Sequence, residues 1–212
     1  MEAFAHSAQL RIEGSTELSS RPMAEVELHE KQLLRQISKG DEAAFALVYA
    51  RHQGQIYRFV LHMTGSSATA EEVTQEVFML LIRNPNGYDP AKGSIGAYLF
   101  GAARNLAWRA IKREVLDVSL DDVPESESIL TDDWDLLEKL SSAERIDLLR
   151  KALLTLPELY REVVVLCDLE EMSYAQSAGI LDCSSGTIAS RLHRAHAMLK
   201  MKLASMVGAS HV

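Results

Sequence analysis

An acidic segment without regular hydrophobic spacing divides this chain into two stretches that repeat apolar residues at helical spacing. Residues 114–147 carry 12 acidic and 2 basic side chains, whereas residues 41–113 carry 6 acidic and 8 basic ones. Apolar residues three and four positions apart predict amphipathic helices. We therefore expect an all-α protein with two small helical domains, residues 28–113 and 145–205, joined by an acidic linker at residues 114–144.

The bulk composition is that of a soluble globular protein, with 47% hydrophobic and 25% charged residues in a chain of 212. No apolar run is long enough to span a membrane, and no secretory signal is visible at the N-terminus. The two cysteines, Cys167 and Cys183, lack metal-ligand spacing, and no acids, bases or nucleophiles cluster. We expect a cytoplasmic protein without membrane insertion, cofactor, metal or enzymatic activity. Residues 1–27 are expected to form a mobile extension and residues 206–212 a tail.

The net charge of −8 argues at first against a nucleic-acid partner, but its distribution reverses that argument. The acidity is concentrated in the central segment, and the sequence from Cys183 onward holds 4 basic residues and no acidic ones. Both flanking stretches therefore keep locally basic surfaces. The intact free chain, with its acidic middle, is expected to bind DNA poorly.

The stretch from Ser94 to Arg113 is predicted to form a helix with one packing face and one face suited to nucleic acid. Its apolar stripe contains Leu99, Ala102, Ala103, Leu106 and Ala110. Its other face carries Gly101, Arg104, Asn105, Trp108, Arg109 and Lys112, with Arg113 beside it. Cations neutralise phosphates, an indole ring offers a stacking plane, and an amide can bond a base edge. The alternative is a solvated basic helix with a half-exposed tryptophan.

Before this stretch, three helices are predicted: one ended by Gly40, one from an Asp41 N-cap to Gly65, and one from about Ala70 to Arg83. Residues 66–69 are expected to form the turn before the last of these. One face of that helix combines acidic and polar side chains with an adaptable methionine, namely Glu72, Gln75, Glu76 and Met79. Such a face suits docking on a basic partner surface, although a solvated acidic face is the alternative.

The C-terminal stretch contains a helix-turn-helix pattern. Pro157 is expected to restart a helix at its first turn. Ser173 and Gln176 form a predicted capping box for a short helix that ends near Leu181. A turn at residues 182–184 leads into a longer helix from about Ser185 to Leu203. Its buried stripe is Ile188, Leu192, Ala195 and Leu199, and its outer face is Thr187, Ser190, Arg191, Arg194 and Met198. Such a second helix fits the major groove of DNA. An ordinary helical hairpin with a basic side is the alternative.

Five segments, taken in order, resemble bacterial sigma factors of the extracytoplasmic-function group. They are E-E-V-T-Q-E-V-F, G-Y-D-P-A-K-G, A-Y-L-F-G-A-A-R-N-L-A, L-P-E-L-Y-R-E-V-V-V-L and S-Y-A-Q-S-A-G-I-L-D-C-S-S-G-T-I-A-S-R-L-H-R-A. The similarity covers about Leu28 to Leu203. It implies two helical domains, sigma region 2 and sigma region 4, that bind core RNA polymerase and direct promoter recognition and DNA melting. It also implies control by an anti-sigma factor.

The resemblance assigns residues to three partners. Contacts with the promoter −10 element would come from Tyr88, Lys92, Arg104, Asn105, Trp108, Arg109, Lys112 and Arg113, with Tyr88 and Lys92 in the loop that helps hold a flipped base. Contacts with duplex at the −35 element would come from Ser185, Thr187, Ser190, Arg191 and Arg194. Contacts with core polymerase would come from Glu72, Gln75, Glu76 and Met79. The chain departs from the family pattern at Ser177, Gly179 and Ala189, which puts the −35 sequence it recognises in question.

Two other functions compete with promoter recognition by a polymerase subunit. A stand-alone helix-turn-helix regulator predicts tight duplex binding without polymerase and a symmetric footprint. An acidic adapter that binds only proteins predicts polymerase binding without any promoter effect. The interleaved Asn105, Trp108 and Arg109 face is redundant in a stand-alone regulator and argues against that alternative.

Overall fold

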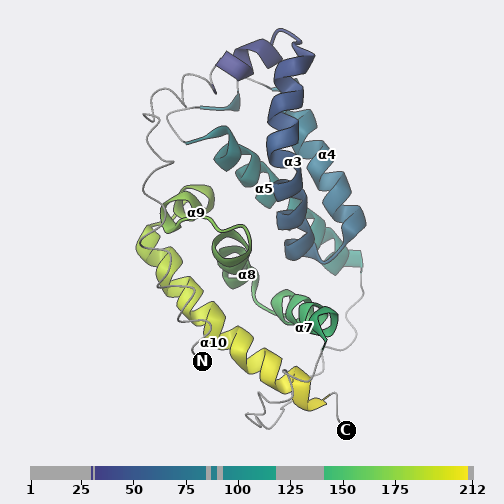
Figure 1. The fold of residues 1–212 in the computed structure, drawn as a ribbon, viewed down its shortest axis with the longest axis vertical. Helices are drawn as coiled ribbons and strands as arrows, with labels where there is room; N and C mark the ends of the chain where they lie inside the picture. The colour runs from purple at the N-terminus through teal and green to yellow at the C-terminus, as the bar shows by residue number, and fades with distance from the viewer. Residues whose placement is uncertain (1–29, 31, 85–86, 90–92, 118–140, 210–212) are drawn as a thin grey trace.

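The computed structural model describes residues 30, 32–84, 87–89, 93–117 and 141–209, and their regular elements are helical (Figure 1). The first half contains α3 (Glu42–Thr64), α4 (Ser67–Arg83) and α5 (Ile95–Asp117), preceded by a short helix over residues 32–37. The second half contains α7 (Ser142–Leu154), α8 (Glu158–Val164), the π-helix η3 (Val165–Leu169), α9 (Tyr174–Leu181) and α10 (Ser185–Ala209). The predicted all-α class is confirmed.

Parts of the predicted domain layout lie outside the described residues. These parts are the whole N-terminal extension at 1–27, most of the linker at 114–144, and the last three residues of the tail. Two helices extend beyond their predicted ends, α5 to Asp117 rather than Arg113 and α10 to Ala209 rather than about Leu203. None of the helices in the described ranges is both long enough and apolar enough to cross a membrane.

The helices of the first half begin and end where local chemistry favours it. The Asp41 side chain accepts hydrogen bonds from the backbone N–H groups of Ala43 and Ala44, and α3 stops at Gly65, whose φ of 75° is left-handed. The predicted turn at residues 66–69 is wrong. Ser66 accepts from the Thr69 N–H and is the N-cap, so α4 already begins at Ser67.

Helix α5 is fixed to α3 by aromatic packing and at its start by two side chains. The rings of Phe59 and Phe100, both nearly fully buried, pack edge to face with centroids 5.4 Å apart. The Ser94 hydroxyl accepts from the Ala97 N–H, as predicted, and the Glu30 carboxylate accepts from the Ile95 N–H. The buried stripe of α5 is Ile95, Leu99, Phe100, Ala103, Ala107 and Ala110. The predicted members Ala102 and Leu106 are only partly buried.

In the second half, serine caps and a π-helix set the helix boundaries. The predicted capping box of Ser173 and Gln176 is present, and Ser184 caps α10 by accepting from the Thr187 N–H. Pro157 is the N-cap of α8 rather than a residue of its first turn. Directly after α8, the backbone of η3 closes with a bond from the Glu170 N–H to the Val165 carbonyl, five residues apart.

The two halves pack directly against each other, which the picture of two tethered units did not predict. Helix α3 contacts α7, α8 and η3, and α5 contacts α9. Figure 1 shows α8 between α10 and the α3–α5 pair, with α10 on the outer side. Buried apolar residues of both halves form one continuous cluster. A Cβ at Gly65 would lie 2.6 Å from Leu154 Cδ1, so a larger residue there would have to displace the end of the Leu154 side chain.

Arg161 joins the halves through backbone carbonyls. Arg161 is 9% exposed, and its guanidinium donates to the carbonyl of Met63 at the end of α3, to that of Leu154 at the end of α7, and to that of Leu156 between α7 and α8. The carbonyls of Met63 and Leu154 belong to helix ends, where no intrahelical donor is available. One buried cation therefore satisfies acceptors from both sides of the interface.

Candidate nucleic-acid interface

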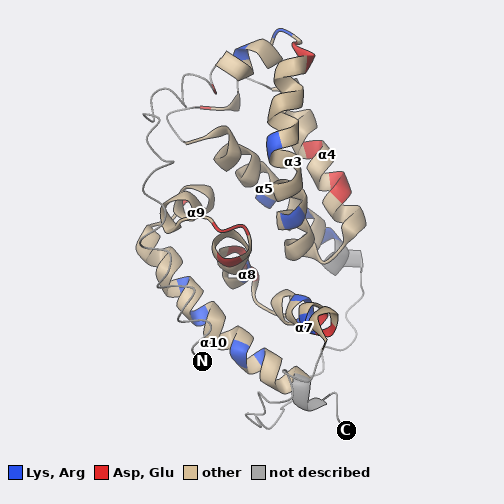
Figure 2. Cartoon of the chain, in the orientation of Figure 1, with Lys and Arg blue, Asp and Glu red and all other residues tan. Residues whose placement is uncertain are grey.

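The polar face of α5 is partly exposed and partly covered by the second half. Asn105, Arg109, Lys112 and Arg113 are exposed, whereas Arg104 and Trp108 are half-buried. Two cations flank the indole, since Arg104 Cζ lies 5.7 Å and Lys112 Nζ lies 5.8 Å from the centroid of the Trp108 ring. Figure 2 shows Lys and Arg on α5 and along α10, and Asp and Glu on α4 and near α8.

Arg104 and Trp108 bind a carboxylate from the other half. Glu162 on α8 is fully buried, and its oxygens accept from Arg104 Nε at 2.5 Å and Arg104 Nη2 at 3.2 Å. The Trp108 indole N–H donates to the same carboxylate. Sequence analysis did not identify Glu162, because it lies 54 and 58 positions from its partners and nothing local marks it.

A second ion pair joins the halves near the end of η3. Arg58 donates from Nε and Nη2 to the two oxygens of Glu170, at 3.2 and 2.9 Å. Burial raises the pKa of Glu170 above its ordinary value, and the Arg58 guanidinium opposes that shift. Both buried carboxylates at this interface are thus held by paired donors from an arginine of the first half.

Tyr88 is not exposed to a DNA base in this structure. It is 8% exposed, its hydroxyl lies 3.0 Å from Glu30 Oε2 and 2.8 Å from the Gly93 carbonyl, and its ring packs on that of Tyr98. These contacts connect the loop to the start of α5. The role of Tyr88 in holding an unstacked base stays a prediction, and Lys92 lies outside the described residues.

The outer face of α10 is open at its N-terminal half. Ser185, Ser190 and Arg194 are exposed, and Thr187 and Arg191 are half-buried. The four predicted core positions of this helix, Ile188, Leu192, Ala195 and Leu199, are all buried. Among the described residues no carboxylate pairs with the two arginines. The helix therefore presents hydroxyls and free guanidinium groups together, which suits phosphates and base edges.

The first helix of this motif tolerates its two unusual residues for different reasons. A Cβ at Gly179 would meet no heavy atom within 4 Å, so no packing contact requires glycine there. Ser177 is fully buried, and its hydroxyl lies 3.3 Å from the sulfur of Cys167, which is itself buried as predicted. The hydroxyl thus has a partner inside the core.

The outer face of α4 mixes charge with exposed apolar surface. Glu72 and Gln75 are exposed, Met79 is 40% exposed, and the Glu76 carboxylate lies 3.7 Å from Arg83 Nη1. Ile82, 46% exposed and one turn beyond Met79, extends the apolar part of this face and was missed by sequence analysis. Its helical spacing from Met79 is the signal that identifies it.

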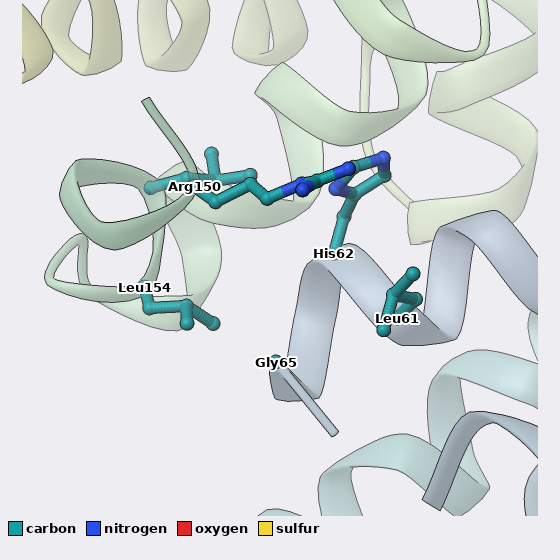
Figure 3. Close-up of a pocket in the computed structure, with 6 residues that line it drawn as sticks. Leu61, His62, Gly65, Arg150 and Leu154 are labelled. Carbon is teal, nitrogen blue, oxygen red and sulfur yellow. The ribbon is translucent and has the colours of Figure 1, made fainter. Parts of the chain in front are cut away.

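A shallow pocket of about 220 Å³ lies between α3 and α7 (Figure 3). It is lined by Leu61, His62, Gly65, Arg150, Leu153 and Leu154, and the guanidinium of Arg150 lies beside the imidazole of His62. Burial lowers the pKa of His62 below its ordinary value, and the positive charges of Arg150 and Arg58 lower it further. Within the described residues no group of three or more His, Cys, Asp or Glu is placed to hold a metal ion.

His62 makes stability depend on pH. Because its pKa is lowered in the folded state, the unfolded chain binds the proton first, and the free energy of unfolding should fall as pH drops below about 6.5. The same holds for His52, whose pKa is lowered mainly by burial. Glu170 acts in the opposite sense, since its raised pKa reduces stability as pH rises above about 4.5.

We expect His62→Gln to flatten this dependence without abolishing it, because His52 remains. Urea unfolding at a series of pH values from 7.5 to 5 measures the slope. The control is His193→Gln, a change at an exposed position of α10. An unchanged slope in His62→Gln would contradict this assignment.

The halves of this fold match two parts of one protein family. Residues 48–115, from α3 to α5, match the family described as sigma-70 region 2, and residues 146–199, from α7 to α10, match that described as sigma-70, region 4. The chain is 29% identical over 185 residues to the ECF RNA polymerase sigma factor SigW of Bacillus subtilis (strain 168), a similarity that covers 84% of this chain and 98% of that protein. It is 30% identical over 169 residues to the ECF RNA polymerase sigma factor SigE of Mycolicibacterium smegmatis, covering 78% and 65% of the two chains.

Solved structures share the fold. CnrH in complex with the cytosolic domain of CnrY superimposes with a TM-score of 0.59 at 23% identity, over 85% of this chain and 97% of that one. The sigma factor RpoE in complex with the anti-sigma factor NepR from Bartonella quintana gives 0.56 at 24% identity, over 75% and 96%. With regions 2 and 4 in order on the two halves of the structure, the chain belongs to the extracytoplasmic-function group of the sigma-70 family of RNA polymerase sigma factors.

Proposed function

We propose that this chain binds core RNA polymerase and directs it to promoters, where it recognises the −35 and −10 elements and stabilises the melted strand. The observation that carries this proposal is the ordered pair of matches, region 2 over residues 48–115 and region 4 over residues 146–199. A stand-alone helix-turn-helix regulator would need only the second match. The match over the first half therefore favours the sigma factor over that alternative.

In the proposed mechanism α10 binds duplex DNA at the −35 element. Thr187, Ser190 and Arg191 lie on successive positions of the outer face, where a recognition helix meets base edges and phosphates. Ser185 and Arg194 extend that face toward the flanking backbone. Gly179 leaves open space beside the preceding helix, so the departure from the family pattern removes a side chain without disturbing the packing.

The −10 element is assigned to α5. Asn105 is exposed and offers an amide to a base edge, and Arg109, Lys112 and Arg113 supply cations along the same helix. A base that leaves the duplex loses stacking worth a few kcal/mol, and contacts made only by the extruded base offset that loss. Stabilising the open strand in this way requires no bond chemistry, so no catalytic residue is assigned.

Core polymerase is assigned to the outer face of α4. Glu72, Gln75 and Glu76 offer acidic and amide groups to a basic surface, while Met79 and the neighbouring Ile82 offer apolar contact. Polymerase then holds both DNA-binding halves on one particle. Two weak contacts made together raise the effective concentration of each. This explains why an acidic chain can act on DNA only as part of a larger complex.

We further propose that the chain acts in the cytoplasm and that an anti-sigma factor controls it. A structural relative is a sigma factor in complex with the anti-sigma factor NepR. Such an inhibitor needs surface that polymerase or DNA also uses. The outer face of α4 and the polar face of α5 are the surfaces at which competition would have this effect.

Transcription with purified bacterial core polymerase tests the proposed function. The templates are duplex fragments with randomised −35 and −10 segments, and the transcripts are sequenced to find the promoters used. We expect polymerase with the wild-type chain to select a defined pair of elements. Asn105→Ala and Trp108→Ala should each reduce open-complex formation about tenfold or more, since each loses contacts to the melted strand.

The matched control is Gln53→Ala, which removes an exposed amide from α3 on a surface with no assigned partner. It should leave transcription unchanged. Full open-complex formation in both α5 variants would overturn the −10 assignment. Absence of any transcript that depends on the wild-type chain would overturn the function itself.

A further inference from the structure

The polar face of α5 already holds an anion in this structure. The fork of Arg104 donates from Nε and Nη2 to the two oxygens of Glu162, and the Trp108 indole N–H donates to one of them. Arg104 and Trp108 are four positions apart, one helical turn, so their donors converge from the same side of α5. The two residues therefore form a preformed site for an oxyanion with two oxygens in reach.

The burial of Glu162 shows that the donors of Arg104 and Trp108 can compensate a negative charge that has no contact with water. The carboxylate has no exposure to solvent, whereas the Arg104 side chain is 26% exposed. A buried carboxylate is tolerated only when paired and hydrogen-bonded, and here one guanidinium and one indole supply all the donors identified. Two oxygens on one centre, bound by the parallel N–H groups of an arginine, are also the pattern by which proteins bind phosphate.

We propose that Arg104 and Trp108 form a binding site for a backbone phosphate of the promoter strand, and that Glu162 occupies this site when the two halves are packed together. This inference rests on the proposed function, and it assigns the Trp108 indole N–H to a phosphate rather than its ring to a base. Phosphate and carboxylate need the same donors, so they exclude each other. The packed chain cannot use this part of the −10 face.

The competition between Glu162 and a DNA phosphate involves α5 and not the outer face of α10. The outer face of α10 lies on the far side of the second half, with Ser190 and Arg194 exposed. Binding at this helix therefore does not require the halves to separate, whereas phosphate binding by Arg104 does. The second inter-half pair, Arg58 with Glu170, adds to the packing but donates nothing to the Arg104 site. Glu162 is thus the one described carboxylate that competes directly with DNA at this site.

Binding of a fluorescein-labelled single-stranded oligodeoxynucleotide of mixed sequence to the full-length chain, without polymerase, tests the proposal. Glu162→Gln keeps the shape of the side chain and removes its charge. We expect fluorescence anisotropy to show binding about tenfold tighter than wild type, because a charge-assisted competitor is lost. Adding Arg104→Gln to this variant should remove the gain. The control Glu158→Gln removes the same charge one turn earlier on α8, where no arginine in the described part of the first half pairs with it, and should change binding less than about twofold.

The indole N–H resonance of Trp108, assigned with a Trp134→Phe variant, gives a second measurement. In Glu162→Gln it should shift on addition of the oligonucleotide, and in wild type it should not shift at the same concentration. Equal gains in Glu162→Gln and Glu158→Gln, or a gain that survives Arg104→Gln, would overturn the proposal.

A further variant keeps the proposal testable if Glu162→Gln does not fold. Trp108→Phe retains an aromatic ring but has no N–H donor, and in the polymerase complex it should weaken open-complex formation about fivefold. In the same complex, Arg104→Gln should reduce the slope of log promoter affinity against log salt concentration by about 1, the value expected for one lost phosphate contact. Wild-type behaviour in both would overturn the phosphate site while leaving the proposed function intact. If core polymerase makes no transcript that depends on the wild-type chain, the proposed function is overturned, whatever the result of the oligonucleotide-binding experiment.

Discussion

Replacing Arg161 with methionine is expected to lower the free energy of unfolding by about 3–5 kcal/mol. Methionine fills a similar volume but donates no hydrogen bond. The carbonyls of Met63, Leu154 and Leu156 would each lose a donor inside the protein. Buried acceptors left without partners cannot recover their bonds to water. Urea or guanidinium unfolding followed by circular dichroism measures the change.

The control for this experiment is Arg150→Met. Among the described residues Arg150 forms an ion pair with Asp147 on its own helix, and its side chain is 55% exposed, so its removal should cost less than about 1 kcal/mol. Arg161→Lys should fall between the two, because one ammonium keeps the charge but not the geometry of the fork. A loss below about 1 kcal/mol in Arg161→Met would show that the three carbonyls find other donors.

Replacing Phe100 with alanine is expected to destabilise the chain by about 3–5 kcal/mol. The ring is 1% exposed and packs edge to face on Phe59, so its removal leaves a cavity between α5 and α3. This contact also sets the orientation of α5, and hence of the polar face opposite. As temperature is raised, transcription by core polymerase with the Phe100→Ala chain should therefore be lost at a lower temperature than transcription with the wild-type chain.

Leu47→Ala is the matched control. Leu47 lies on α3, as Phe59 does, but it is 63% exposed, and its truncation should change stability by no more than about 0.5 kcal/mol. Chemical denaturation of both variants gives the comparison. Similar losses from Phe100→Ala and Leu47→Ala would mean that the aromatic contact contributes little to the packing of α5.

Features that depend on a few neighbouring residues were predictable from the sequence. Asp41, Ser94 and the box formed by Ser173 and Gln176 cap helices as expected, because a cap is decided within four positions. The four predicted buried positions of α10 are all buried, since its period is unbroken, but Met198, predicted on the outer face, is partly buried and packs against the core. The start of α4 was misplaced, because a turn and a cap at Ser66 use the same residue types.

Contacts between distant segments were not predictable from local pattern. Glu162 and Glu170 look like ordinary charged residues of a helical stretch. Their partners are distant in sequence, since Arg104 precedes Glu162 by 58 positions and Arg58 precedes Glu170 by 112. The half-burial of Arg104 and Trp108 has the same origin. Sequence analysis therefore identified the residues of the candidate interface on α5, but not the side chain that occupies it.

The π-helix after α8 has a geometric consequence for the two buried carboxylates. In a regular α-helix, residues 162 and 170 would differ in direction by about 80°, since each residue turns about 100°. The extra residue that η3 accommodates makes their separation equivalent to seven positions and reduces the difference to about 20°. Both carboxylates can then point to one side, each toward its own arginine. If the same residues formed a regular α-helix throughout, the two carboxylates would point about 80° apart, and one of the two ion pairs between the halves would be lost.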